Sequence, residues 1–251
     1  MDIPYQFELT ILVLIIVAFT PSLIYLGWLR RAPKMGRVPA WALIKTFLFG
    51  AILGIIFAVI LELILIYFYG VYGGRIYDLV GMKGSSLPDW FILACVIAPV
   101  VEELVKLAGV HWFRNSIYLR TDGIVLGASV GLGFAATENL IYEYDALAKG
   151  LEMFILVAVL RSISSALLHG SATAISGNGV ERAKFENRSG PIFIGYIIAV
   201  SIHAIFNFFA SGGALYEGQY GEWTYLIGFF VVLLLAWGSI YYVRSKIQSE
   251  S

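Results

Sequence analysis

The chain has 251 residues, of which 59% are hydrophobic and only 14% are charged, and its formal net charge is zero. Soluble domains carry about 25% charged residues, so this composition, with a mean hydropathy of +0.83, excludes an ordinary soluble domain. The chain has no basic block that would indicate nucleic-acid binding, and its single cysteine, Cys95, excludes an internal disulfide.

Apolar runs of about 20 residues, the length that crosses a bilayer, recur along the whole chain. They predict an all-α, polytopic membrane helical bundle with about seven transmembrane helices (seven or eight), in a single domain covering residues 1–251. The N-terminal residues lack the basic region of a signal peptide, so the first run is expected to be a retained span. The predicted spans are residues 6–29, 41–68, 89–112, 122–143, 151–176, 191–210 and 223–243.

Lysine and arginine are distributed unevenly between the two sets of loops, and this predicts the orientation by the positive-inside rule. Three basic residues lie in the N-terminal segment and the even-numbered loops: Arg75, Lys83 and Lys149. Eleven lie in the odd-numbered loops and the C-terminal tail: Arg30, Arg31, Lys34, Arg37, Arg114, Arg120, Arg182, Lys184, Arg188, Arg244 and Lys246. The expected location is therefore the cell membrane, with the N-terminus outside and the C-terminus in the cytoplasm.

The third span contains two adjacent glutamates, Glu102 and Glu103, in an otherwise apolar run. A charged residue at the bilayer centre costs about 2.5–3.5 kcal/mol on insertion scales, so these carboxylates are expected to face a protein interior or a wet cavity. Lys106 follows Glu102 by four residues and can pair with it on one helix face. Glu103 is rotated by about 100° from Glu102, so a purely structural ion pair is expected to leave Glu103 without a partner.

The next three spans each add polar side chains within an apolar run. They are, in chain order, Glu138, Asn139, Arg161, His169, His203 and Asn207. The seventh span has no ionisable residue between Trp223 and Arg244. Polar residues that are concentrated on spans three to six favour one shared site over scattered structural polar groups. We therefore expect a catalytic core of four consecutive helices over about residues 90–210.

Depth along the helices gives a first test of this site. At about 1.5 Å per residue from the predicted cytoplasmic ends, Glu102 lies roughly 13 Å into the membrane, His169 about 10 Å and His203 about 18 Å. Glu138 comes out near 24 Å on the same scale. The first three residues are therefore expected at one level, and Glu138 farther outward unless its helix starts later or bends.

These residue types suit the activation of water for hydrolysis of an amide. A glutamate in apolar surroundings can act as a general base, and a histidine can share that task or protonate the leaving amine. A histidine and an asparagine four residues apart can aim two donors at a developing oxyanion. Carboxylates and imidazoles also bind zinc, but the chain lacks a His-Glu-x-x-His motif. A divalent metal such as zinc is therefore compatible with these residues and not required by them.

Two other classes of function use the same polar set. Intramembrane Glu, His and Lys also build proton relays, so a proton-coupled transporter or channel is an alternative, although no inverted repeat accompanies them. A non-catalytic membrane scaffold could use the same pocket to hold a partner helix. Residues 127–131 match Gly-x-Ser-x-Gly, but this hydrolase motif needs a strand–turn–helix context and here lies in a membrane helix.

The polar motifs resemble those of the PrsW family, which is grouped with the CAAX-processing and bacteriocin-immunity membrane proteases. The resemblance is carried by four motifs on successive spans: Glu102-Glu103-x-x-Lys106, Phe134-x-x-x-Glu138-Asn139, His169 and His203-x-x-x-Asn207. It implies an intramembrane endopeptidase of the glutamate type that requires no cofactor, with a metalloprotease left open.

The resemblance also implies roles for these residues. Glu102 would be the base that activates water, assisted by His169, and His203 and Asn207 would form an oxyanion hole. The other two glutamates of the motifs would orient or tune the site. The expected partners are the lipid bilayer and a membrane-protein substrate, either single-pass or lipid-anchored, and no nucleic acid. PrsW-like enzymes cleave single-pass proteins such as anti-sigma factors, and CAAX enzymes cleave prenylated C-termini, so the substrate class stays open.

Overall fold

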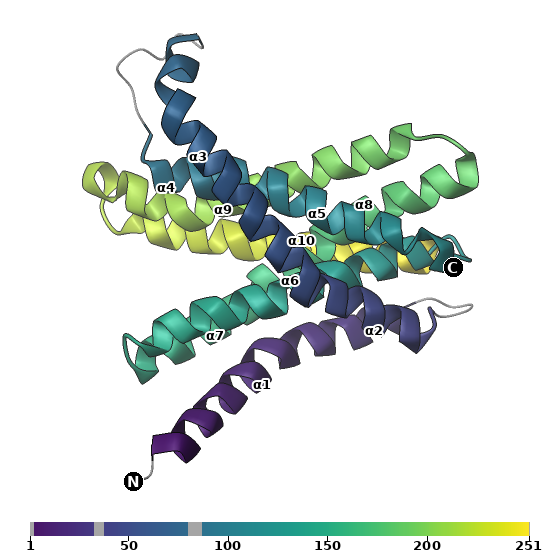
Figure 1. Ribbon diagram of the computed structural model, residues 1–251, viewed down its shortest axis with the longest axis horizontal. Coiled ribbons are helices and arrows are strands. Elements are labelled where there is room, and N and C mark those ends of the chain that lie inside the picture. Colours follow the sequence, from purple (N-terminus) through teal and green to yellow (C-terminus); the bar gives the residue numbers. More distant parts are fainter. Residues whose placement is uncertain (1–2, 33–37, 80–86, 251) are drawn as a thin grey trace.

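The computed structural model describes residues 3–32, 38–79 and 87–250. Three basic residues of the charge count, Lys34, Arg37 and Lys83, lie outside the described residues, as does the side chain of Arg75. Every regular element in the described part of the chain is a helix, and the helices form an elongated bundle (Figure 1). The predicted all-α class is therefore confirmed.

The helices follow one another with short connections. They are α1 (Ile3–Arg30), α2 (Ala40–Leu48), the π-helical segment η1 (Phe49–Gly54), α3 (Ile55–Leu79), α4 (Asp89–Ile92), the π-helical segment η2 (Leu93–Ile97), α5 (Ala98–Trp112), the 3₁₀ turn η3 (Arg114–Ser116), α6 (Asp122–Leu147), α7 (Leu151–Ile163), α8 (Ser165–Glu186), α9 (Gly190–Tyr220) and α10 (Trp223–Glu250).

Six stretches of the described residues are long and apolar enough to cross a membrane. The remaining predicted span, the third, is formed by α4, η2 and α5, which continue one another from residue 89 to residue 112. This stretch is less apolar because it contains Glu102, Glu103 and Lys106. The helical bundle with six to seven membrane-spanning segments agrees with the predicted architecture.

The fifth span differs from the single helix of residues 151–176 that the sequence predicts. Its helix is interrupted at Ser164, whose backbone leaves the helical region at φ −127° and ψ −71°. The second half, α8, then continues to Glu186, well past the predicted end. Polar residues of these last turns, such as Glu181, are buried against neighbouring helices, so α8 extends beyond its apolar segment.

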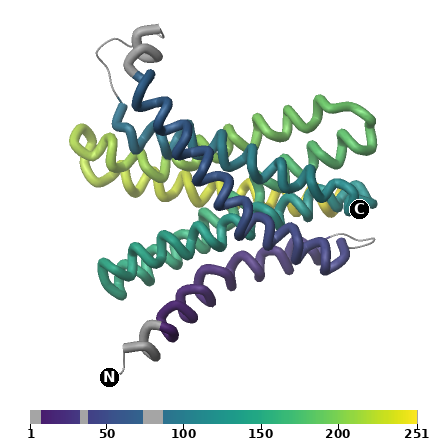
Figure 2. The backbone as a smooth tube through the Cα atoms, in the orientation of Figure 1, coloured from purple at the N-terminus to yellow at the C-terminus, as the bar shows by residue number. Residues whose placement is uncertain are grey.

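The ends of α5, α8 and α10 lie together at one end of the bundle, on the right in Figures 1 and 2. One lysine and one arginine make hydrogen bonds that join the helices at this end. Lys184 Nζ donates to the carbonyl oxygens of Arg114 (3.0 Å) and Ile117 (2.7 Å). Arg244 Nη1 donates to the carbonyl of Trp28 at 2.6 Å, which ties the end of α10 to the end of α1. The described basic residues of the odd-numbered connections therefore share one end of the molecule.

Helix α6 lies at the centre and packs against α1, α2, η1, α7 and α8. Two glycines allow its closest contacts. A Cβ on Gly131 would lie 2.1 Å from the carbonyl oxygen of His169 on α8, and a Cβ on Gly50 of η1 would lie 2.0 Å from the carbonyl oxygen of Val130. Because both distances are far below van der Waals contact, these helices approach to a separation that only glycine permits.

The Gly-x-Ser-x-Gly match at residues 127–131 is part of this packing. Ser129 is buried within α6 and its Oγ donates to the carbonyl of Leu43 on α2 at 2.9 Å. A Cβ on Gly127 would lie 2.4 Å from the carbonyl oxygen of Thr173. The motif therefore lies in a helix interior and serves helix contacts, in agreement with the interpretation that the match is coincidental.

Candidate active site

The ammonium group of Lys106 lies at the centre of the polar cluster. Its side chain is completely buried, and its Nζ lies 3.0 Å from Glu102 Oε2, 2.9 Å from Glu103 Oε1 and 2.7 Å from His169 Nδ1. An ammonium has three protons, so each of these contacts can be a hydrogen bond. Lys106 thereby joins two carboxylates of its own helix to an imidazole of α8.

The expectation that Glu103 is left without a partner is wrong. On a helix, positions three and four residues apart are both neighbours, and the long lysine side chain reaches Glu102 at i−4 and Glu103 at i−3 at the same time. The 100° rotation separates the two Cα–Cβ directions, but it does not separate the carboxylates at the ends of flexible side chains.

Glu103 also connects α5 to the two neighbouring helices that carry histidines. Its Oε1 lies 3.1 Å from His203 Nδ1 on α9, and its Oε2 accepts a hydrogen bond of 3.3 Å from Thr173 Oγ1 on α8. The side chain is completely buried and does not line the cavity described below. Glu103 therefore holds Lys106 and His203 in place instead of facing the open side of the cluster.

Glu138 contacts His169 from the side opposite to Lys106. Its Oε2 lies 2.8 Å from His169 Nε2 and 2.9 Å from Arg161 Nη2 at the end of α7. Neither contact has the geometry of a linear hydrogen bond, and the contact with His169 is an ion pair only when that imidazole is protonated. Arg161 continues the network, because its Nε donates to Asn139 Oδ1 at 2.8 Å and its Nη2 to Ser165 Oγ at 3.0 Å. A neutral His169 that carries its proton on Nε2 suits both neighbours, since Nδ1 can then accept from Lys106.

The structure corrects the predicted depth of His169 and leaves that of Glu138 unchanged. Because α8 ends at Glu186 and not near residue 176, His169 lies about 26 Å along α8 from that end. Glu138 lies about 24 Å along α6 from Asp122. The two residues are at a similar distance from the same end of the bundle, and Glu138 belongs to the cluster.

Asn207 reaches the cluster from α9 through an irregular part of the third span. Its Nδ2 donates to the carbonyl of Ala94 at 2.7 Å. Ala94 lies in the π-helical segment η2, and Pro99 follows within the next helical turns. Proline has no N–H to return to the preceding turn, so a carbonyl of that turn is left free for a side-chain donor. An amide has a second Nδ2 proton, which can point toward the cavity.

A cavity of about 250 Å³ adjoins these groups, between α3, the third span, α6 and α9. Three predicted site residues line it: Glu102, Glu138 and Asn207. Its other walls are mostly apolar. His169 lies directly behind the carboxylates, within 3.8 Å of Glu102 Oε2 and 2.8 Å of Glu138 Oε2. The arrangement offers carboxylates and an amide to a small molecule such as water in one cavity, with an imidazole directly behind the carboxylates.

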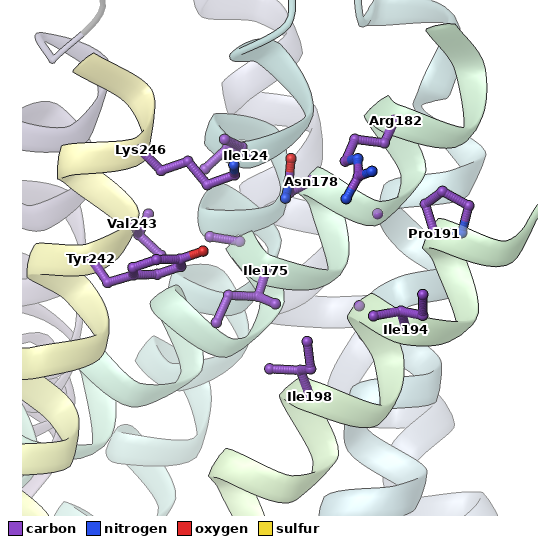
Figure 3. A pocket seen from close by; sticks show the side chains of 13 residues that line it. Ile124, Ile175, Asn178, Arg182, Pro191, Ile194, Ile198, Tyr242, Val243 and Lys246 are labelled. Carbon is purple, nitrogen blue, oxygen red and sulfur yellow. The ribbon is translucent and has the colours of Figure 1, made fainter. Parts of the chain in front are cut away.

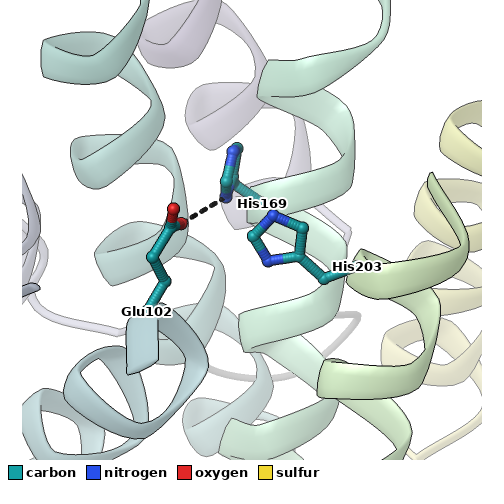
Figure 4. A group of neighbouring side chains, drawn as sticks. All are labelled: Glu102, His169 and His203. Atoms are coloured by element: carbon teal, nitrogen blue, oxygen red, sulfur yellow. Dashed lines mark ion pairs between the residues drawn. The ribbon is translucent and has the colours of Figure 1, made fainter. Parts of the chain in front are cut away.

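The two histidines pack against each other at the centre of the cluster (Figure 4). Their ring centroids are 4.8 Å apart in an edge-on arrangement, and Glu102 faces His169 from the neighbouring helix. One ligand atom from each of Glu102, His169 and His203 lies within 4.8 Å of the others. Two histidines and a glutamate are a donor set that zinc uses in catalytic sites.

The donor atoms of these side chains are of the types that bind a divalent metal. Whether they can bind one depends on the position of Lys106. Glu103 contacts Nδ1 of His203, as a second partner does when it orients a metal-ligating histidine. The Lys106 ammonium, however, contacts Glu102 and His169, two of the three ligands. These residues therefore fit a divalent metal when the lysine side chain withdraws from them.

The sequence interpretation assigned no role to several residues of the site. Glu62 of α3 and Tyr142 of α6 line the cavity, and Thr173 contacts Glu103. Glu62 could have been found because it is an ionisable residue inside a predicted span. Tyr142, whose ring lies 3.9 Å from the Arg161 guanidinium, and Thr173 carry no such signal. His111 is exposed at the end of α5, outside the cluster.

A comparison with known protein families shows which family this chain is related to. The family described as PrsW family intramembrane metalloprotease matches residues 38–236. The chain belongs to the PrsW family. The match covers all four motifs and every helix that contributes to the cluster, so the residues that the structure brings together lie within the region shared by the PrsW family.

Individual relatives in the PrsW family are distant. The chain is 28% identical over 201 residues to Protease PrsW of Clostridioides difficile (strain 630), covering 78% of each chain. It is 25% identical over 223 residues to Protease PrsW of Oceanobacillus iheyensis, covering 85% of this chain and 87% of the relative. It is 27% identical over 169 residues to Protease PrsW of Geobacillus kaustophilus, covering 65% and 67%. No solved structure matches this chain.

Proposed function

We propose that this protein hydrolyses a peptide bond of a membrane-associated protein at the cavity lined by Glu102, Glu138 and Asn207. The observation that supports this most is the position of Glu102. Its Oε2 is held by Lys106, while the residue lines a cavity of about 250 Å³ that is large enough for water. The family relationship supports a protease, since the matched relatives are named Protease PrsW.

In the proposed reaction, Glu102 takes a proton from a water that attacks the scissile carbonyl carbon. Attack makes a tetrahedral intermediate with one negative oxygen. The free Nδ2 proton of Asn207 can meet this oxyanion. Nε2 of His203 can do so only when the imidazole is protonated on both nitrogens, because Nδ1 already donates to Glu103. The proton held by Glu102, or one relayed through His169 at 3.8 Å, then passes to the leaving amine as the C–N bond breaks.

Glu103 and Glu138 act in this proposal by positioning the histidines. Glu103 holds His203 through Nδ1, and Glu138 holds His169 through Nε2. With a divalent metal bound by Glu102, His169 and His203, the metal would supply polarisation of the carbonyl and a more acidic water. The reaction without a metal and the reaction with a metal would both use Glu102 and the same cavity.

We further propose that the protein lies in the cell membrane with its C-terminus in the cytoplasm. The basic residues of the odd-numbered connections support this orientation. The substrate is then a membrane protein, single-pass or lipid-anchored, that reaches the cavity from the bilayer. Helix α3 forms one wall of this cavity and carries a largely exposed apolar surface toward lipid.

The test is cleavage of a model single-pass peptide by the purified protein in proteoliposomes. Glu102→Gln keeps the shape of the side chain and removes its basicity, so we expect cleavage to stop while the thermal unfolding midpoint stays near that of the unmodified protein. Glu8→Gln, an exposed change near the start of α1, is the matched control and should cleave normally. Full cleavage by Glu102→Gln would refute the assignment of the base.

The same vesicles separate the other two classes of function. A proton-coupled carrier would move a solute in response to a proton gradient without cleaving the peptide. A scaffold would retain the intact peptide tightly during purification. Either behaviour, with no cleavage by the unmodified protein, would contradict the protease proposal.

A further inference from the structure

A second cavity, of about 170 Å³, lies between α8, α9 and α10 and shares no lining residue with the cavity of the candidate active site (Figure 3). Its lining is polar toward one end and apolar toward the other. The polar side chains are Asn178, Arg182 and Lys246, and the apolar ones include Ile175, Ile198 and Tyr242. The cavity is therefore amphipathic along its length.

The side chains that line the polar end include two cations and no carboxylate. Arg182 and Lys246 come from different helices, and their charged groups point toward the space around Asn178 (Figure 3). Each pairs with a glutamate one turn farther along its own helix, Arg182 Nε with Glu186 at 2.9 Å and Lys246 Nζ with Glu250 at 2.6 Å. Glu186 also pairs with Arg188. Among these residues, three cations therefore share two carboxylates.

Asn178 adds an acceptor that the protein does not satisfy. Its Oδ1 is buried and receives no hydrogen bond from the described residues. A buried carbonyl oxygen without a donor costs free energy comparable to a lost hydrogen bond. A ligand that carries a hydroxyl or N–H beside its negative charge would remove this cost, whereas a bare apolar chain would not.

The cavity lies at the bundle end where α8 ends at Glu186 and α9 begins at Gly190. Exposed aromatic residues surround this end, among them Trp112, Tyr118 and Phe185. Aromatic side chains prefer the level of the lipid headgroups. The cationic end of the cavity therefore lies at the level of lipid phosphates, and its apolar end extends toward the acyl chains.

We propose that this cavity binds the headgroup end of an anionic glycerophospholipid. The phosphate lies between Arg182 and Lys246, a headgroup hydroxyl donates to Asn178 Oδ1, and the start of an acyl chain lies against Ile198 and Tyr242. Basic pockets between membrane helices are suited to such headgroups. The bound lipid joins α10 to α8 and α9, the helices that carry His169 and His203, and thus supports the candidate active site without taking part in its chemistry.

The experiment measures lipid binding by the full-length protein after it has been stripped of lipid in a neutral detergent. Native mass spectrometry is recorded with phosphatidylglycerol, with phosphatidylcholine and with glycerol 3-phosphate. The binding proposal is independent of proteolysis, so its failure and the failure of the proposed function are distinguishable. We expect the protein to bind one phosphatidylglycerol molecule tightly. Phosphatidylcholine should bind more weakly, because it has neither a net negative charge nor a headgroup donor. Glycerol 3-phosphate should not compete with phosphatidylglycerol.

Two variants and a control make the result specific to this cavity. The double variant Arg182→Gln with Lys246→Gln should bind phosphatidylglycerol roughly tenfold more weakly or worse. Ile198→Trp, which extends from a half-exposed position into the cavity, should also lose the lipid. Arg120→Gln removes an exposed cation at the same end that does not line the cavity, and it should bind normally.

Thermal unfolding gives a second readout if a variant folds poorly. Phosphatidylglycerol should raise the unfolding midpoint of the unmodified protein and of Arg120→Gln, but not that of Ile198→Trp or the double variant. Equal binding of phosphatidylglycerol and phosphatidylcholine, or unchanged binding by the double variant, would overturn the proposal. Full competition by glycerol 3-phosphate would also overturn it, because the site would then recognise a free phosphate ester and not a lipid.

Discussion

Nζ of Lys106 lies 2.7 Å from Nδ1 of His169 and thereby links α5 to α8 at the centre of the bundle. The same ammonium contacts Glu102 and Glu103. One buried cation thus fixes the positions of the proposed base and of the imidazole beside it. The glutamate pair can remain in the apolar interior because this lysine compensates part of its charge.

Removing the lysine charge is expected to destabilise the fold as well as the site. Lys106→Met keeps the length of the side chain but leaves two buried carboxylates without their cation, and breaking a buried ion pair in this way costs about 3–5 kcal/mol. We expect a large decrease in the unfolding midpoint and loss of cleavage, measured by thermal unfolding in detergent and by the proteoliposome assay.

The control for this change is Lys45→Met, which removes an exposed lysine of α2 that lies over the Trp41 ring. It should change the midpoint little. Combining Lys106→Met with Glu103→Gln removes one of the two uncompensated charges and should recover part of the stability. A double variant no more stable than Lys106→Met would contradict the charge explanation.

Two glutamates of α6 provide a matched comparison for the role of Glu138. Glu138 contacts His169 and Arg161, whereas the carboxylate oxygens of buried Glu143 have no hydrogen-bond partner among the described residues. Glu138→Gln should lower kcat/KM by about 100-fold, since a displacement of the histidine by about 1 Å has an effect of this size.

Glu143→Gln should leave kcat/KM unchanged and leave stability unchanged or raised, because an unpaired buried carboxylate already carries a desolvation cost. Steady-state kinetics on the model peptide and thermal unfolding measure both effects. Equal losses of activity in the two variants would mean that α6 tolerates no change of charge, and the specific role of Glu138 would be lost.

The sequence predicts the membrane bundle well because the bundle depends on long apolar runs, and these runs are a strong and local signal. The polar motifs on spans three to six are also visible, since each interrupts such a run. Their meeting in space follows from connectivity, because consecutive spans joined by short loops are neighbours. Glu102 and His169 could therefore be placed together before any coordinates were known.

Other features of the site depend on backbone details that the apolar pattern does not contain. The break at Ser164 and the extension of α8 to Glu186 place His169 beside Glu138, and the predicted helix ends missed both. The π-helical segment η2 carries the same apolar residues as an α-helix would, so the contact of Asn207 with the Ala94 carbonyl has no signal in the sequence. The contacts of Lys106 with both Glu102 and Glu103 depend on side-chain positions that the sequence pattern does not contain.

Zinc binding offers a test of the competition between a metal and Lys106. The ammonium contacts Glu102 and His169, two of the three candidate ligands, so its removal should free them. We expect Lys106→Met to bind zinc more tightly than the unmodified protein by about tenfold, the factor that corresponds to 1.4 kcal/mol. Titration with a zinc-competing dye measures this without any cleavage assay. The combination of Lys106→Met with His203→Ala should lose the gain, and an unchanged affinity in Lys106→Met would argue against zinc at these residues.

Asn207 is expected to contribute to the rate and not to substrate binding. Asn207→Ala removes the amide that can meet the oxyanion, and loss of one such donor lowers kcat by about 10²–10³-fold. Ser201→Ala on an exposed part of α9, where the hydroxyl only donates to the Ile197 carbonyl of its own helix, is the control and should keep its activity. A large rise in KM with unchanged kcat for Asn207→Ala would assign the residue to substrate binding instead.

The close approach of α6 to α8 should limit the size of residue 131. A Cβ on Gly131 would lie 2.1 Å from the carbonyl oxygen of His169, so Gly131→Ala must push the two helices apart. Overpacking of this kind costs about 1–3 kcal/mol, and it should also move His169 away from Glu138 and reduce cleavage. Gly238→Ala on α10, where no atom lies within 4 Å of the added methyl group, should be neutral or stabilising, because alanine favours a helix by about 1 kcal/mol over glycine. Thermal unfolding and cleavage by the two variants compare these effects. A Gly131→Ala variant with normal stability and activity would show that the site tolerates a wider separation of α6 and α8 than the glycine contact implies.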